Sequence, residues 1–112
     1  MSEIGSHTAE SWRNKVLSND AAVTSRLQYL YGDDTPIVES RRQLLLQAIE
    51  TFIGVYGPDR DVILSRAPGR INLLGNHIDH RGGHVNYMAI NRDMILVASA
   101  NDDDTVRLAN AN

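Results

Sequence analysis

Residues 66–85 bring together side chains that could act on one small molecule. Arginines, histidines, asparagines, an aspartate and several glycines surround a short apolar run at residues 71–74. Glycines let the backbone approach a ligand closely, and short polar side chains supply donors and acceptors for hydroxyl groups. An arginine supplies a planar fork for phosphate or carboxylate. The pattern predicts a strand that anchors a polar binding loop. Its candidate residues are Arg70, Asn76, His77 and Asp79.

The same stretch closely resembles the first conserved motif of galactokinases, which runs roughly A-P-G-R-x-N-L-I-G-E-H-x-D-Y-x-x-G-x-V. The corresponding residues are Ala67, Pro68, Gly69, Arg70, Asn72, Leu73, Leu74, Gly75, His77, Asp79, Gly83 and Val85. The resemblance covers roughly residues 37–108. Three positions depart from the family: Asn76 replaces a glutamate, His80 replaces a tyrosine, and Tyr87 replaces a proline in the next strand.

Galactokinase-type members of the GHMP kinase superfamily transfer a phosphoryl group from ATP to the anomeric hydroxyl of a hexose. The resemblance therefore implies that the product is a sugar 1-phosphate, made from galactose or a related sugar. Arg70 matches the catalytic arginine that contacts the substrate and stabilises the charge of the transferring group. His77 and Asp79 match residues that bind sugar hydroxyls, and Asn76 is expected to contact the sugar beside them.

The resemblance also implies partners beyond the sugar. In the family, ATP and Mg²⁺ bind through a phosphate loop, a catalytic aspartate and a glycine-rich motif that lie downstream of this region. We therefore expect both to bind through the remainder of the kinase chain, and the 112 residues alone to be inactive. No residue here is expected to bind the nucleotide or a metal.

Apolar spacing divides the chain near Gly57 and Pro58 into a helical part and a strand-rich part. Helices are expected at residues 12–17, 21–31 and 37–56. Thr35 is the expected N-cap of the third helix, Pro36 its first residue and Gly57 its C-cap. Strands are expected at residues 62–64, 71–74, 85–90, 94–100 and 105–108, with interruptions at 67–69 and 91–93 and a turn at 101–104.

These elements predict an α+β domain that is incomplete, because a sheet must bury its apolar face against another layer. Together with the resemblance, they indicate the N-terminal portion of the GHMP kinase fold, which is ribosomal protein S5 domain 2-like, with a mixed sheet and N-terminal helices. We expect a helical extension over residues 1–35 and the truncated kinase domain over residues 36–112.

Composition argues against several other classes. The net charge is −3, so no basic surface for nucleic acid is expected, and no run is long and apolar enough for a membrane helix. The sequence has no cysteine and shows no secretory signal. We therefore expect a cytoplasmic protein whose partners are a small-molecule sugar, ATP and the rest of the kinase, without nucleic acid or membrane.

Two alternatives remain open. His77, Asp79, His80 and His84 approach the His-x-His-x-Asp-His pattern of metal-dependent hydrolases, but Gly75 occupies the position of the first ligand. The other alternative is a non-catalytic sugar-binding or regulatory galactokinase relative, which the change to Asn76 keeps possible. Outside the loop, Arg66 is expected to be a surface cation, and residues 102–104 a solvated turn.

Overall fold

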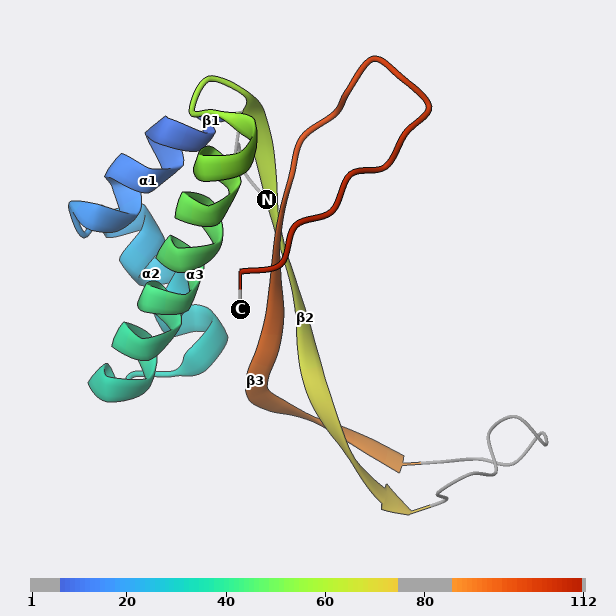
Figure 1. Cartoon of the computed structure of the whole chain (residues 1–112). Coiled ribbons are helices and arrows are strands. Elements are labelled where there is room, and N and C mark those ends of the chain that lie inside the picture. The colour runs from blue at the N-terminus through green and yellow to red at the C-terminus, as the bar shows by residue number, and fades with distance from the viewer. Residues whose placement is uncertain (1–6, 75–85, 112) are drawn as a thin grey trace.

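The computed structural model describes residues 7–74 and 86–111, in which helices cover one face of a long hairpin (Figure 1). The elements, in chain order, are β1 (His7–Thr8), α1 (Ala9–Leu17), α2 (Ala21–Tyr31), α3 (Thr35–Tyr56), β2 (Asp61–Leu74) and β3 (Asn86–Ala98). The strands form an antiparallel sheet in the order β1-β2-β3. The α+β class is therefore confirmed. The mixed sheet is wrong for the described strands, and the assignment to the GHMP fold stays a prediction.

Short polar residues begin the helices. The Thr8 hydroxyl accepts a hydrogen bond from Ser11 N at 3.1 Å at the start of α1. For α3, the N-cap is Asp34 rather than the expected Thr35, and its carboxylate accepts from Ile37 N at 3.4 Å. A carboxylate also interacts favourably with the positive end of the helix dipole. Gly57 ends α3 with a φ of 94°, as its expected role as C-cap requires.

The main core lies between the helices and the part of the hairpin that contains Leu64 and Val97. Ile49 of α3 and Val16 of α1 are the largest fully buried side chains. Val23 and Leu27 of α2 join them, and Leu64 of β2 packs against the same cluster. All three helices therefore share one core across residue 35. The division into a 1–35 extension and a 36–112 domain stays a prediction.

Arg42 is the charged exception inside this core, because only 7% of the residue is exposed. Its guanidinium donates to Thr24 Oγ1 at 3.2 Å and to the Val16 carbonyl at 3.5 Å, and it pairs with Glu39 at 3.2 Å. Arg42 thus connects α3 to the end of α1 and the start of α2. These contacts satisfy donors that would otherwise be costly to bury.

The two strands of the hairpin are continuous where the sequence predicted interruptions. Pairing runs from Ile63 opposite Ala98 to Leu74 opposite Asn86, so residues 67–69 belong to β2 and residues 91–93 to β3. Beyond Val62, no described strand lies on the other edge of β2. An edge strand tolerates a proline, which explains why Pro68 does not end it.

At residues 91–93, where the sequence predicts a turn or bend between two strands, β3 continues through a bulge. Pro68 pairs with Asp93 and Arg70 pairs with Ala89, so Gly69 alone faces residues 90–92 of β3. A Cβ atom on Gly69 would lie 3.1 Å from the Arg92 carbonyl oxygen. β3 bends part-way along its length (Figure 1), and such a bend is typical of a bulged strand. Beyond the bend, the hairpin projects away from the helices.

The C-terminal segment contains the expected turn but lacks the expected strand. Asp103 Oδ1 accepts a hydrogen bond from Thr105 N at 2.9 Å, which is the local contact typical of an aspartate turn. Residues 105–108 have no strand assignment, because they are exposed and pair with no described strand. Gln47 of α3 contacts the Ala111 carbonyl at 3.2 Å and so connects this segment to the helices.

Among residues 7–74 and 86–111, no helix has the length and apolar character needed to cross a bilayer.

Candidate functional site

Arg70 is the predicted site residue that the structure describes. It lies on β2, opposite Ala89, at the first pair beyond the bulge, and its side chain is exposed. The part of the hairpin beyond the bulge, to which Arg70 belongs, projects away from the helices (Figure 1). Asn76, His77 and Asp79 lie outside the described residues, as do the rival metal ligands His80 and His84.

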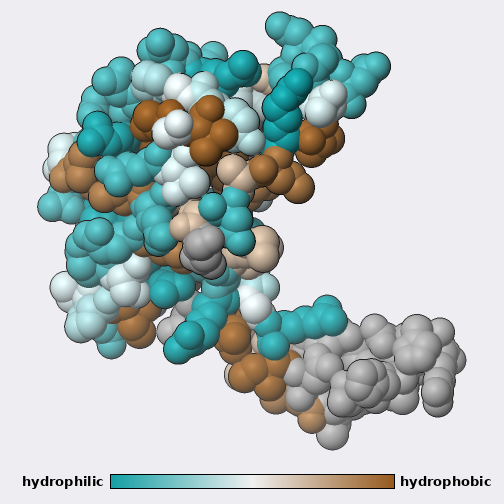
Figure 2. Space-filling model, in the orientation of Figure 1, coloured by the Kyte–Doolittle hydropathy of each residue, from teal (hydrophilic) through white to brown (hydrophobic). Residues whose placement is uncertain are grey.

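Exposed apolar side chains accompany Arg70 on this arm. Ile71, Leu73 and Met88 are 46%, 57% and 50% exposed. Figure 2 shows hydrophobic side chains at the surface of the arm, next to the residues drawn in grey. An apolar surface of this kind is typical of a segment that contacts something else.

A buried carboxylate lies on the other side of the bulge from Arg70. The Asp93 side chain is 0% exposed and is surrounded by Arg66, Arg41 and Tyr31. Arg66 Nε and the Tyr31 hydroxyl both donate to Asp93 Oδ2. Arg41 Nη1 lies 3.5 Å from Oδ1, an ion pair without hydrogen-bond geometry, because Oδ1 accepts no hydrogen bond. We call these four residues the Asp93 cluster.

Arg66 and Tyr31 also contact each other directly. Arg66 Nε donates to the Tyr31 hydroxyl at 3.0 Å, and the guanidinium carbon lies 4.9 Å from the centre of the tyrosine ring. A guanidinium near an aromatic face gains cation–π attraction. The expectation that Arg66 is a surface cation is therefore wrong, since its side chain is only 25% exposed and is paired with Asp93.

The protonation states within the cluster follow from these contacts. Burial raises the pKa of Tyr31, and its hydrogen bond to Asp93 raises it further. For Arg66, burial acts against the charged form, but hydrogen bonds to Asp93 and Tyr31 outweigh it and raise the pKa. At neutral pH Arg66 is therefore charged and Tyr31 is neutral.

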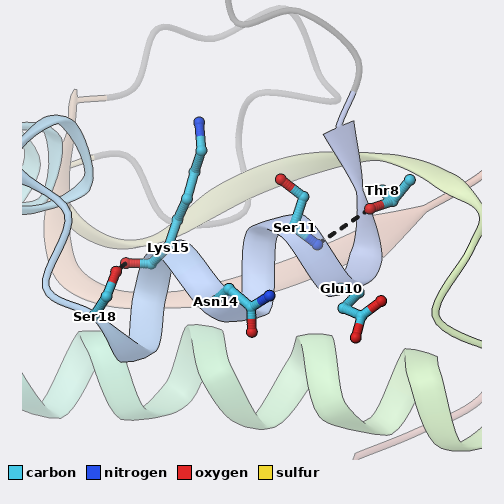
Figure 3. Close-up of a pocket in the computed structure, with 6 residues that line it drawn as sticks. All are labelled: Thr8, Glu10, Ser11, Asn14, Lys15 and Ser18. Carbon is cyan, nitrogen blue, oxygen red and sulfur yellow. Dashed lines mark hydrogen bonds between the residues drawn. The ribbon is translucent and has the colours of Figure 1, made fainter.

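Arg70 does not line either of the two best-defined hollows on the described surface. The larger, of about 690 Å³, lies between the helices and β2. Its lining includes Trp12, Leu27, Tyr31, Arg41, Leu64 and Arg66. The smaller, of about 450 Å³, lies along α1 between Thr8 and Ser18 (Figure 3). In that view the polar side chains of α1 point in different directions, and the only contacts drawn are local ones.

Within residues 7–74 and 86–111, no three His, Cys, Asp or Glu side chains gather closely enough to hold a metal ion. This includes the acidic turn at residues 102–104, where Asp103 pairs with Arg107 at 2.9 Å.

Comparison with known proteins shows that the stretch of sequence around Arg70 is similar to galactokinases. Residues 50–100 match a family model described as the galactokinase galactose-binding signature. The resemblance to galactokinases is confirmed. The chain is 34% identical to a galactokinase of Dictyostelium discoideum over 76 residues, which are 66% of this chain and 15% of that protein. It is 39% identical to a galactokinase of Streptococcus suis over 66 residues, 59% of this chain and 17% of that protein.

A galactokinase of Lacticaseibacillus casei is 48% identical over 46 residues, 41% of this chain and 12% of that protein. The chain thus spans less than a fifth of the length of each of these three galactokinases. No solved structure matches it. The galactokinase signature includes Arg70, Arg66 and Asp93, whereas Tyr31 and Arg41 lie outside it.

Proposed function

We propose that this chain is the sugar-binding N-terminal part of an ATP-dependent kinase. The kinase phosphorylates galactose, or a closely related hexose, at its anomeric hydroxyl. The single observation that supports this most strongly is the galactose-binding signature across residues 50–100. That range contains the whole motif from Ala67 to Val85, with its arginine, histidine and aspartate at the family spacing.

In this proposal Arg70 stabilises the phosphoryl group as it passes to the sugar. Phosphoryl transfer depends on positioning and on electrostatic stabilisation more than on covalent chemistry, and a guanidinium offers fixed donors to phosphate oxygens. Arg70 lies on the exposed surface of the hairpin arm. Removing it should therefore lower kcat more than it changes the sugar KM.

The sugar is recognised by Asn76, His77 and Asp79. An ionised Asp79 can accept hydrogen bonds from two neighbouring hydroxyl groups. Such recognition discriminates strongly between sugars, because a missing hydroxyl leaves a desolvated polar group unpaired. Asn76 lacks the charge of the family's glutamate and adds a donor, so it adjusts the choice among related hexoses.

ATP and Mg²⁺ bind through the remainder of the kinase chain. The described residues do not gather carboxylates fit for Mg²⁺, so we assign no metal-dependent step to them. Arg70 then meets the phosphoryl group at the boundary between the two parts. A cytoplasmic location stays a prediction from the sequence.

The first experiment measures galactose binding to the purified chain by calorimetry, with Asp79→Ala as the test variant. Loss of a hydrogen-bond partner that carries a charge costs about 1.5–3 kcal/mol, so Kd should rise roughly tenfold to a hundredfold. Arg13→Gln is the control, because Arg13 lies on α1 in an exposed pair with Glu50. An unchanged Kd for Asp79→Ala would remove Asp79 from the proposed site.

The second experiment separates the enzyme from a non-catalytic sugar-binding relative, which Asn76 keeps as the alternative. The complete protein is given ATP and a panel of free sugars, and ADP release is measured. Release with galactose, abolished by Arg70→Ala, supports the kinase. Galactose binding without ADP release with any sugar supports the non-catalytic relative instead.

A further inference from the structure

The Asp93 cluster joins every long element of the fold at one point. Tyr31 is the last residue of α2, Arg41 lies on α3, Arg66 lies on β2, and Asp93 lies on β3. Asp93 is also the first paired residue of β3 after the bulge at residues 90–92, on the side nearer the helices. The cluster therefore fixes the hairpin to the helices at the place where the arm begins.

An apolar side chain could fill the buried position of Asp93, so packing alone does not explain the charge there. Ile95 and Val97 follow it at alternate positions of β3, and Val97 packs against the helical core. Replacing a buried ion pair by apolar side chains often leaves a protein equally stable or more stable. A buried carboxylate that binds two arginines and a tyrosine instead restricts the geometry, because each partner must stay within hydrogen-bond or ion-pair distance.

Arg70 depends on that geometry. It forms the next pair along the hairpin after the one between Pro68 and Asp93, and Gly69 between them packs so closely against β3 that a Cβ atom would lie 3.1 Å from the Arg92 carbonyl oxygen. β2 then continues to Leu74, directly before the residues proposed to bind the sugar. A change in the angle of the arm at Asp93 would move Arg70 relative to the helices.

We infer that Asp93 is a positioning residue. Its buried carboxylate holds Arg66, Arg41 and Tyr31 around the base of the bulged hairpin, and so sets the course of β2 from Arg70 to Leu74, after which the proposed sugar-binding residues follow in the sequence. This inference rests on the proposed function. Asp93 does not touch the substrate, and it acts on binding only through the orientation of the arm.

The test compares two identical substitutions in the full chain. Asp93→Asn keeps the shape of the side chain and removes its charge. Asp103→Asn does the same at an exposed aspartate that also pairs with an arginine. Galactose Kd is measured by calorimetry at a temperature where circular dichroism shows each variant to be folded. We expect at least a tenfold weaker Kd for Asp93→Asn and a change within twofold for Asp103→Asn.

A purely stabilising role is excluded by a second variant, in which Asp93→Leu, Arg66→Met, Arg41→Met and Tyr31→Phe together replace the Asp93 cluster with apolar side chains. We expect it to melt close to the wild-type temperature while galactose binding stays at least tenfold weaker. Wild-type binding in this quadruple variant, or in folded Asp93→Asn, would overturn the inference. If neither variant folds, Tyr31→Phe decides: severalfold weaker binding supports the inference, and unchanged binding overturns it.

The outcome is distinct from failure of the proposed function. A wild-type chain that binds no galactose would refute the proposed function. A wild-type chain that binds galactose, together with an Asp93→Asn variant that binds it equally well, would refute the positioning role alone.

Discussion

Replacing Gly69 with alanine tests the close packing of the bulge. The added Cβ atom would lie 3.1 Å from the Arg92 carbonyl oxygen and 3.2 Å from two side-chain carbons of Ile90. The backbone oxygen cannot move without shifting the bulge itself, and forcing extra atoms into a packed site typically costs about 1–3 kcal/mol. We therefore expect Gly69→Ala to lower the free energy of unfolding by about this amount. The melting temperature should fall by roughly 5–15 °C.

Gly54 provides the matched control for the same substitution. It lies on α3, and a Cβ atom there would meet nothing within 4 Å. Alanine favours a helix over glycine by up to about 1 kcal/mol, so Gly54→Ala should stabilise the chain slightly. Urea unfolding followed by circular dichroism measures both variants. If Gly69→Ala were as stable as the wild type, the close contact between Gly69 and the bulge would be refuted.

Two further predictions concern the polar groups inside the fold. The raised pKa of Tyr31 means that the folded chain holds the phenolic proton more tightly than the unfolded chain, so its contribution to stability is complete below pH 10.0 and is lost as the pH rises above it. In the Tyr31→Phe variant the melting temperature should therefore fall less between about pH 9 and 11 than it does in the wild type. An equal fall in both proteins would contradict the raised pKa of Tyr31. Arg42→Met should cost about 1–3 kcal/mol in urea unfolding, because it leaves the Val16 carbonyl and the Thr24 hydroxyl without their donor. Arg13→Gln removes an exposed ion pair and should cost less than about 1 kcal/mol. An equal loss of unfolding free energy in the two variants would show that the buried hydrogen bonds of Arg42 do not stabilise the fold.

The helices could be predicted from the sequence because their signals are local. The residue ranges expected from apolar spacing differ from α2 and α3 by at most two residues, and Gly57 ends α3 as its type suggests. The N-cap was misplaced by one position, because Asp34 and Thr35 can both accept the hydrogen bonds of a helix start. Only the backbone of the folded chain decides between two such neighbours.

The strands were harder to predict because pairing overrides local signals. Pro68 and Gly69 usually interrupt a strand, yet here an edge without a described neighbour tolerates the proline, and the bulge packs closely against the glycine. At residues 105–108 the alternation was sufficient for a strand, but no described strand is available to pair with it. Local propensity thus predicted a break where a strand exists and a strand where none exists. In both places the presence or absence of a partner strand decides the outcome.

Within the candidate site, the motif identified Arg70 but not the residues that support it. The sequence favours a surface cation on an edge strand for Arg66, and this expectation is wrong. Its position at alternate residues after Val62 and Leu64 placed it on the buried face of β2. That alternation was the available signal. The identity of its partner Asp93, 27 residues away, required the register of the hairpin.

The galactokinase signature contains only part of the Asp93 cluster. Arg66 and Asp93 lie within the matched residues 50–100, whereas Tyr31 and Arg41 come before them in the chain. The residues proposed to bind the sugar therefore belong to the signature, while two of the three partners of the Asp93 carboxylate come from outside it. A chain with the same signature but different preceding helices would keep Arg70 and lose two partners of the buried carboxylate. If the positioning role is right, the signature alone does not suffice to place Arg70, and residues 7–56 are part of the site's support.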